Sequence, residues 1–175
     1  EDLAYPTSKL IGAKPPEVVI MNALTVNLHL LLVSFYKPTK TRNKILIERG
    51  AFPSDQYAIE SQIRFHGYSP KQCLIEIKPR EGESCLRIED IQDKIKEFGS
   101  EIATILIGGV NYYTGQLMDM KTITKYGKDV GAKVGFDLAH AIGNVDLYLN
   151  KWNVDFAVWC SYKYLNSGPG NVSSV

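Results

Sequence analysis

The sequence predicts a three-layer α/β/α fold in which helices cover both faces of a mainly parallel central sheet. Short apolar runs alternate along the chain with segments whose apolar residues recur at helical spacing. The apolar runs are nearly continuous, which is typical of strands that are buried on both faces. The connections between these segments are short, and strands that alternate with helices in this way favour a parallel sheet.

The individual elements follow from the same patterns. "MNALTVNLHLLLVSFY" has apolar residues at helical spacing, and its helix should begin between Asn22 and Thr25. "SDQYAIESQIRFHG" predicts a helix with Ser54 as its N-cap and Gly67 as its stop signal. Further helices are expected at 87–99 and 120–132, and strands at 44–48, 73–77, 102–109, 133–137 and 154–160.

Composition excludes several classes of protein. The 175 residues are enough for one domain with a sizeable core, and 45% hydrophobic with 22% charged residues is typical of a soluble globular protein. The net charge of +1 gives no electrostatic reason to expect nucleic acid or an anionic membrane as a partner. The longest apolar run is interrupted by His29 and Ser34 and is too short to span a bilayer.

Cysteine and histidine usage bears on compartment and metal binding. The three cysteines are odd in number and form no CxxC pair, which predicts reduced thiols and a cytoplasmic location. The three histidines lack the spacing of metal ligands, so no metal site is expected.

Two charged residues stand at the ends of predicted strands. Asp137 ends the strand "KVGFD", and Lys163 follows the strand "VDFAVWC". In parallel sheets ligands bind at the carboxyl ends of the strands, so both side chains should reach the same edge. A lysine beside apolar residues loses its proton readily and can attack a carbonyl carbon, such as the aldehyde of pyridoxal 5′-phosphate (PLP).

This cofactor needs further groups that the sequence can supply. Asp137 can face the pyridine nitrogen, the helix that starts near Leu24 and Thr25 can hold the phosphate, and Phe52 can stack on the ring. Each residue also has a simpler explanation, because a strand-end aspartate is often a turn residue and a single lysine is often a surface residue. The residues by themselves predict an α/β domain that is compatible with a PLP site.

Longer motifs identify a family. "GFDLAHAIGNV" and "VDFAVWCSYKYLNSGPG" closely resemble the kynureninases, which are fold-type I PLP enzymes of the class V aminotransferase group. "MNALTVNLHLLLVSFYKPT" and "ERGAFPSDQYAIESQIRFHG" are similar to the same family, so the resemblance covers nearly the whole chain. It implies that residues 1–175 are part of the PLP-binding large domain, without the N-terminal arm and the small C-terminal domain of that family.

The resemblance also implies roles in the reaction. Lys163 would form the Schiff base with the cofactor and then carry the Cα proton as an acid and base. Asp137 would pair with the pyridine nitrogen. His140 would lie close by in the cofactor site, either with a direct catalytic role or as a core histidine fixed by hydrogen bonds.

Four further residues would complete the cofactor site. Leu24 and Thr25 would bind the phosphate through backbone N–H groups and a hydroxyl, and Tyr162 would bind it through its phenol. Phe52 would stack on the ring. The sequence departs from the family at Gly108, where related kynureninases tend to have serine, so one hydroxyl is missing.

The activity that the resemblance implies is hydrolysis of a carbon–carbon bond. The Cβ–Cγ bond of L-kynurenine or 3-hydroxy-L-kynurenine would be cleaved to L-alanine and anthranilate or 3-hydroxyanthranilate, in tryptophan catabolism toward NAD. The family works as a homodimer with its active site at the subunit interface, so a homodimer is expected.

Three alternatives stay open from the sequence. The chain could be another class V PLP enzyme, such as an aminotransferase or a cysteine desulfurase, although the mobile cysteine loop of a desulfurase is not found. It could be a truncated or non-catalytic kynureninase-like chain. A nucleotide-binding α/β domain is disfavoured, because neither G-x-G-x-x-G nor G-x-x-x-x-G-K-[ST] occurs.

Overall fold

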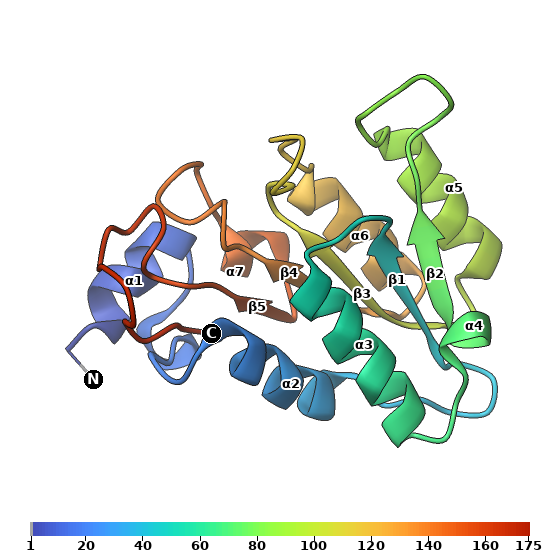
Figure 1. Cartoon of the computed structure of the whole chain (residues 1–175), viewed down its shortest axis with the longest axis horizontal. Helices are drawn as coiled ribbons and strands as arrows, with labels where there is room; N and C mark the ends of the chain where they lie inside the picture. Colours follow the sequence, from blue (N-terminus) through green and yellow to red (C-terminus); the bar gives the residue numbers. More distant parts are fainter. Residues whose placement is uncertain (1) are drawn as a thin grey trace.

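Over residues 2–175, which the computed structural model describes, the chain forms a parallel β-sheet with helices on both faces (Figure 1). The sheet has five strands in the order β2-β1-β3-β4-β5, and every pair of neighbouring strands is parallel. The strands are β1 (Lys44–Glu48), β2 (Leu74–Ile77), β3 (Ile102–Gly108), β4 (Lys133–Asp137) and β5 (Phe156–Val158).

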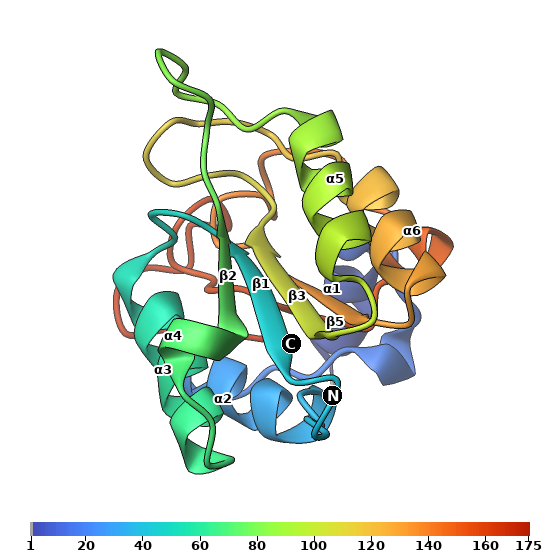
Figure 2. The same cartoon turned by 90° about the vertical axis from the view of Figure 1, so that its right-hand side faces the viewer.

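The helices form the two outer layers. Figure 2 shows α2, α3 and α4 on one side of the sheet and α5 and α6 on the other. The helices are α1 (Ala4–Ile11), α2 (Leu24–Phe35), α3 (Pro53–Phe65), α4 (Pro70–Cys73), α5 (Ile88–Phe98), α6 (Met120–Asp129) and α7 (Leu149–Trp152), with a 3₁₀ turn at Pro15–Glu17. The expected three-layer α/β/α architecture is confirmed.

Each face of the sheet has its own hydrophobic core, which explains why the strands are apolar throughout. Along β1, Ile45 and Ile47 pack with α2 and α3, whereas Leu46 belongs to the core beneath α5 and α6. Successive side chains of a strand point to opposite faces, so a strand between two helical layers needs apolar residues at every position.

Most predicted elements are found, and the differences lie at their ends. Ser54 is not the N-cap of α3: Phe52 occupies that position and Pro53 is the first helical residue. Proline suits the first helical position, because the N–H that it lacks would have no partner there and its φ is already helical. The helix therefore begins at Pro53, and Ser54 lies inside its first turn. β5 is shorter than predicted, and its apolar run continues as Trp159, which pairs with a different segment.

The segment around Ser174 extends the sheet next to Trp159 and runs antiparallel to it. Ser174 forms isolated bridges with both Trp159 and Ile20, and the N–H of Ser173 donates a 2.8 Å hydrogen bond to the carbonyl of Asn22. The residues that precede α2 and the residues that follow the Lys163 loop therefore lie side by side. None of the helices within residues 2–175 combines the length and the apolar character that a membrane span requires.

Candidate cofactor site

A cavity of about 550 Å³ opens at the carboxyl ends of the strands. The strand ends of β1, β3 and β4, the start of α2, the start of α3 and the loop after β5 all contribute to its wall. The structure brings all seven predicted site residues to this cavity: Leu24, Thr25, Phe52, Asp137, His140, Tyr162 and Lys163. Asp137 and Lys163 thus share one edge of the sheet, as the sequence predicts, while the individual roles of the seven stay predictions.

Lys163 stands in a loop that is held by its own polar contacts. The hydroxyl of Ser161 donates to the carbonyl of Val172 over 2.7 Å, and the N–H of Asn166 donates to the carbonyl of Lys163 over 3.1 Å. The Nζ atom lies 3.2 Å from Nε2 of His140. Among the described residues, no carboxylate forms an ion pair with this amine.

The imidazole beside Lys163 is suited to share a proton with it. Burial, and then the positive charge of Lys163, lower the pKa of His140 below its usual value, while Asp137 opposes them. A neutral imidazole accepts a hydrogen bond from an ammonium group through its unprotonated nitrogen. His140 can therefore hold Nζ in place without repelling it.

Two carboxyl groups meet opposite the amine. Asp137 is buried at the end of β4, and its Oδ1 accepts a 2.7 Å hydrogen bond from the N–H of Ala139. Asp55, in the first turn of α3, is 5% exposed. Burial, followed by the charge of Asp137 and a hydrogen bond with it, raises the pKa of Asp55 to about 9. The pair therefore shares a proton at neutral pH.

Asp55 was missed in the sequence analysis, although it is a strong candidate for ligand binding. Its Oδ1 is buried and accepts no hydrogen bond from an N–H or hydroxyl group of the described residues. Buried polar atoms are nearly always paired, so this oxygen needs either the proton shared with Asp137 or a donor supplied by a ligand. The available signal was its position three residues after Phe52, at the start of the same helix.

Glu48 is a third buried carboxyl of this cavity, and the sequence analysis missed it as well. It ends β1 just as Asp137 ends β4. Its pKa is raised to about 7, chiefly by burial; the hydrogen bond from the Gly108 N–H opposes this rise, and the charge of Asp137 adds to it. The reasoning that singled out Asp137 at a strand end applies equally to Glu48.

The start of α2 provides a place for an anion. Ala23 is its N-cap, and no side chain caps the first turn, in which Leu24 and Thr25 line the cavity. The preceding turn is fixed, because Asn22 has a left-handed φ of 52° and its Nδ2 donates to Oδ1 of the buried Asn27 over 3.0 Å. Uncapped N–H groups at the positive end of a helix bind phosphate.

Aromatic side chains form a further wall. Phe52 is 45% exposed, and its ring packs edge-on against Tyr112 with the centroids 5.2 Å apart. The Nζ atom of Lys163 lies 5.7 Å from the centroids of both Phe52 and Tyr162. A flat ring between the amine and the carboxyl pair would lie within reach of Phe52.

These features together fit PLP. An uncapped helix start suits the phosphate, the unpaired Asp55 oxygen beside Asp137 suits a ring N–H, Phe52 suits the ring face, and Lys163 suits the aldehyde. The missing serine at Gly108 leaves no gap, because a Cβ built there would lie 3.0 Å from Oε1 of Glu48.

The chain is similar to curated kynureninases. The chain is 65% identical over 173 residues to a kynureninase of Flavobacterium psychrophilum, covering 99% of this chain and 41% of that protein. It is 55% identical to a kynureninase of Dictyostelium discoideum, covering all of this chain and 39% of that protein. The chain thus spans about 41% of the length of the first of these curated relatives.

Solved structures show the same fold. A cysteine desulfurase from Thermococcus onnurineus NA1 superimposes with a TM-score of 0.78 at 21% identity, covering 99% of this chain and 41% of that one. An alanine–glyoxylate aminotransferase from Nostoc sp. gives a TM-score of 0.75 at 14% identity, with coverage of 99% and 43%. The family model described as Aminotransferase class-V matches residues 6–173. The chain therefore belongs to the class-V aminotransferase family.

Proposed function

We propose that this chain is the cofactor-binding part of a kynureninase. The reaction is the PLP-dependent hydrolysis of the Cβ–Cγ bond of L-kynurenine or 3-hydroxy-L-kynurenine, in tryptophan catabolism toward NAD. One water molecule is consumed, and the products are L-alanine and anthranilate or its 3-hydroxy derivative. The observation that carries the proposal is the single cavity in which Lys163 and the Asp55–Asp137 pair stand together, and the identity of 65% to a curated kynureninase supports it.

The cofactor, when bound, supplies a protonated pyridine ring that withdraws electrons from the substrate carbon next to the amino group. Asp137, with Asp55 beside it, accepts the ring N–H and keeps that nitrogen protonated. The first-turn N–H groups of α2 at Leu24 and Thr25 bind the phosphate, as does the hydroxyl of Tyr162. Phe52 covers one face of the ring.

Lys163 is the covalent attachment point and the proton carrier. Its Nζ lies 3.2 Å from Nε2 of His140, which holds the amine toward the cavity. Once the substrate amine has taken its place, the free Nζ removes the Cα proton, and a proton is returned to the alanine product. His140 is a positioning residue in this scheme.

Cys160 is poorly suited to act as the nucleophile of a desulfurase. Cys160 lines the cavity, but it is 2% exposed and burial raises its pKa. A thiolate nucleophile needs a lowered pKa and access to its substrate.

Further properties of the whole protein are part of the same proposal. Residues 1–175 form part of the large cofactor-binding domain, and the protein is a homodimer in the cytoplasm. The free thiols of Cys73, Cys85 and Cys160 support a reducing compartment.

The attachment of the cofactor can be tested directly. Purified protein of full natural length is mixed with PLP, its visible spectrum is recorded, and borohydride is added before peptide mapping by mass spectrometry. A reduced adduct on Lys163 is expected, and K163A should lose both the adduct and the visible band. K151A is the matched control, because Lys151 also lies over a tyrosine ring but is exposed outside the cavity.

The substrate is tested by incubating the same holoprotein with L-kynurenine and with 3-hydroxy-L-kynurenine. Release of the fluorescent aromatic acid together with an equal amount of alanine is expected. An adduct on Lys163 without either product would refute the kynureninase activity and leave the PLP site standing.

A further inference from the structure

Glu48 belongs to a row of groups that crosses three neighbouring strands at the edge of the cofactor cavity. It ends β1, its neighbour Gly108 ends β3, and Gly108 is in register with Asp137 at the end of β4. The N–H of Gly108 donates to both carboxylate oxygens of Glu48, at 3.0 Å and 3.3 Å. Glu48 is 4% exposed, so its carboxyl depends on these partners rather than on water.

The strand end that Glu48 holds is the one against which Asp137 packs. The N–H of Gly109, the residue that follows β3, donates a 2.7 Å hydrogen bond to the main-chain carbonyl of Asp137. The carboxyl of Glu48 and the backbone of Asp137 are thus tied to two consecutive peptide groups. Movement of Glu48 would be transmitted to the residue that faces the ring nitrogen.

Glu48 also lies against the loop that follows β3. The side chain of Asn111 lowers the pKa of Glu48, and the next residue, Tyr112, packs edge-on against Phe52. The cavity of the cofactor and a second cavity of about 390 Å³ both have Glu48 and Tyr112 in their walls. Glu48 and Tyr112 therefore lie in the wall between the two cavities.

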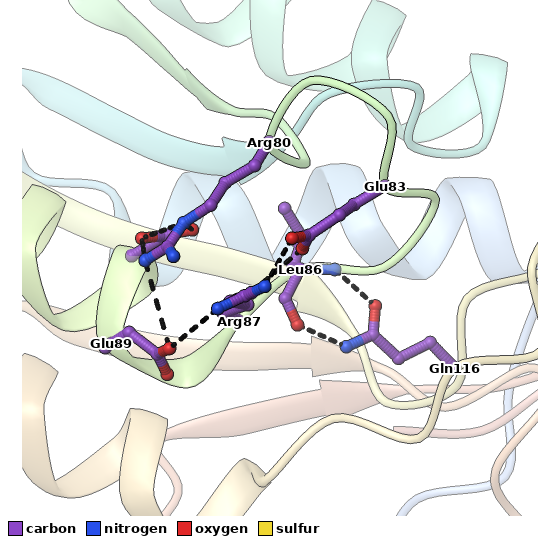
Figure 3. A network of polar contacts seen from close by, with 7 residues as sticks. Arg80, Glu83, Leu86, Arg87, Glu89 and Gln116 are labelled. Atoms are coloured by element: carbon purple, nitrogen blue, oxygen red, sulfur yellow. Dashed lines mark hydrogen bonds and ion pairs between the residues drawn. The ribbon is translucent and has the colours of Figure 1, made fainter.

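The outer side of this loop is braced independently. The amide of Gln116 accepts from the N–H of Leu86 at 2.8 Å and donates to its carbonyl at 2.6 Å (Figure 3). Arg87 pairs with Glu83 next to this contact, which stiffens the loop that carries Leu86. With the outer side fixed, the inner contacts of Asn111 and Glu48 set where the loop meets the cavity.

The charges that face Glu48 come from several elements. Asp137 on β4 repels an ionised Glu48, whereas Asp55 on α3, with its pKa of about 9, stays protonated at neutral pH. His140 and Lys163 line the same cavity from the segments after β4 and β5. Because burial and Asp137 raise its pKa to about 7, Glu48 changes its charge near neutral pH.

We propose that Glu48 is a positioning residue of the cofactor site, which holds Gly108 at the start of the loop that carries Tyr112 and, when ionised, adds its charge to that of Asp137 opposite the ring nitrogen. The inference rests on the proposed PLP site. A ring cation bound beside Asp137 favours the ionised form of Glu48, and linkage then requires the cofactor to bind more tightly as the pH rises through the pKa of Glu48.

The test uses 4-deoxypyridoxine 5′-phosphate, which keeps the ring nitrogen and the phosphate but has no aldehyde to react with Lys163. Its Kd is measured by calorimetry between pH 6 and pH 8 for the wild-type protein of full natural length and for E48Q. Glutamine keeps the shape and the acceptor for the Gly108 N–H, but it cannot ionise. Over this range the affinity of the wild type should rise about fivefold more than that of E48Q.

A second variant, E48A, separates the effect of the hydrogen bond that Glu48 accepts from the effect of its charge. E48A leaves the Gly108 N–H without its acceptor, so it should bind the probe about fivefold or more weakly than E48Q even at pH 6. E76Q is the matched control, because Glu76 lies exposed on the neighbouring strand β2, and it should follow the wild type.

The outcomes separate the inference from the proposed function. Parallel pH curves for the wild type and E48Q, or equal affinities for E48A and E48Q at pH 6, would overturn the role of Glu48 while binding of the probe upholds the PLP site. A wild-type protein that does not bind the probe at any of these pH values would overturn the proposed site, and the role of Glu48 with it.

Discussion

Replacing Asp55 by asparagine should make the cofactor-free protein more stable at alkaline pH. Asp55 and Asp137 meet in a buried cavity wall, and burial with mutual repulsion raises the pKa of Asp55 to about 9. In the unfolded chain an aspartate loses its proton near pH 4. Between these values the folded protein therefore holds a proton that the unfolded chain does not, and stability falls as the pH rises.

The size of the effect on stability follows from that single proton. When the folded state binds one proton more than the unfolded state, the free energy of unfolding falls by about 1.4 kcal/mol for each pH unit of rise, or about 4 kcal/mol between pH 5 and pH 8. The amide of asparagine can donate to Asp137 without binding a proton, so D55N should lack this part of the slope. The same variant should bind PLP more weakly, because Asp55 supplies the unpaired oxygen of the cavity wall.

The assay is equilibrium urea unfolding of the cofactor-free protein at pH 5, 6, 7 and 8, followed by the fluorescence of the buried Trp159. D146N is the control, because Asp146 is exposed and lies outside the cavity. If the stability of D55N and that of the wild type fall with the same slope, the shared proton is not there and the argument for the carboxyl pair fails.

Three further changes test other parts of the structure. K163M should raise the pKa of His140, observed by NMR, because the lysine charge adds to burial in lowering it; an unchanged pKa would mean that the two groups are not neighbours. D155N should cost about 2 kcal/mol in urea unfolding at pH 7, because a buried carboxylate accepts from two lysines and a main-chain N–H; the loss should shrink as the pH falls below the ordinary carboxyl range, since the pKa of Asp155 is lowered. G135A should cost about 3 kcal/mol, because its Cβ would lie 2.2 Å from the ring of Phe156; the double variant with F156L should recover part of the loss, and an additive result would contradict a direct clash.

The sheet could be predicted because β1, β3 and β5 have buried apolar residues on both faces and β4 is buried from Val134 to Asp137. Such strands need nearly continuous apolar residues, and their runs stand out in the sequence, whereas the edge strand β2 still shows three apolar residues around the exposed Glu76. The helices α1, α4 and α7 were not predicted. α4 and α7 have four residues each, which is too few to show a periodic pattern, and the eight residues of α1 show only a short one. The start of α3 was misplaced at Ser54 because Pro53 decides it.

The site was predicted in part, for a similar physical reason. Strand-end charges such as Asp137 are visible in a sequence once the strands are known, and Lys163 follows from the same rule. Asp55 was missed because an aspartate in the first turn of a helix normally only complements the helix dipole. Its burial against Asp137 comes from the packing of α3 across the sheet, which no local pattern contains.

The hydrogen bond between the N–H of Ser173 and the carbonyl of Asn22 has a consequence for ligand choice. It joins the segment that precedes α2 to the segment that follows the Lys163 loop, so neither can slide along the other. In the proposed site this fixes the distance between a phosphate at the start of α2 and an aldehyde at Lys163. A vitamin B6 analogue with one bond more or fewer between those two groups would reach the start of α2 or Lys163, but not both at once.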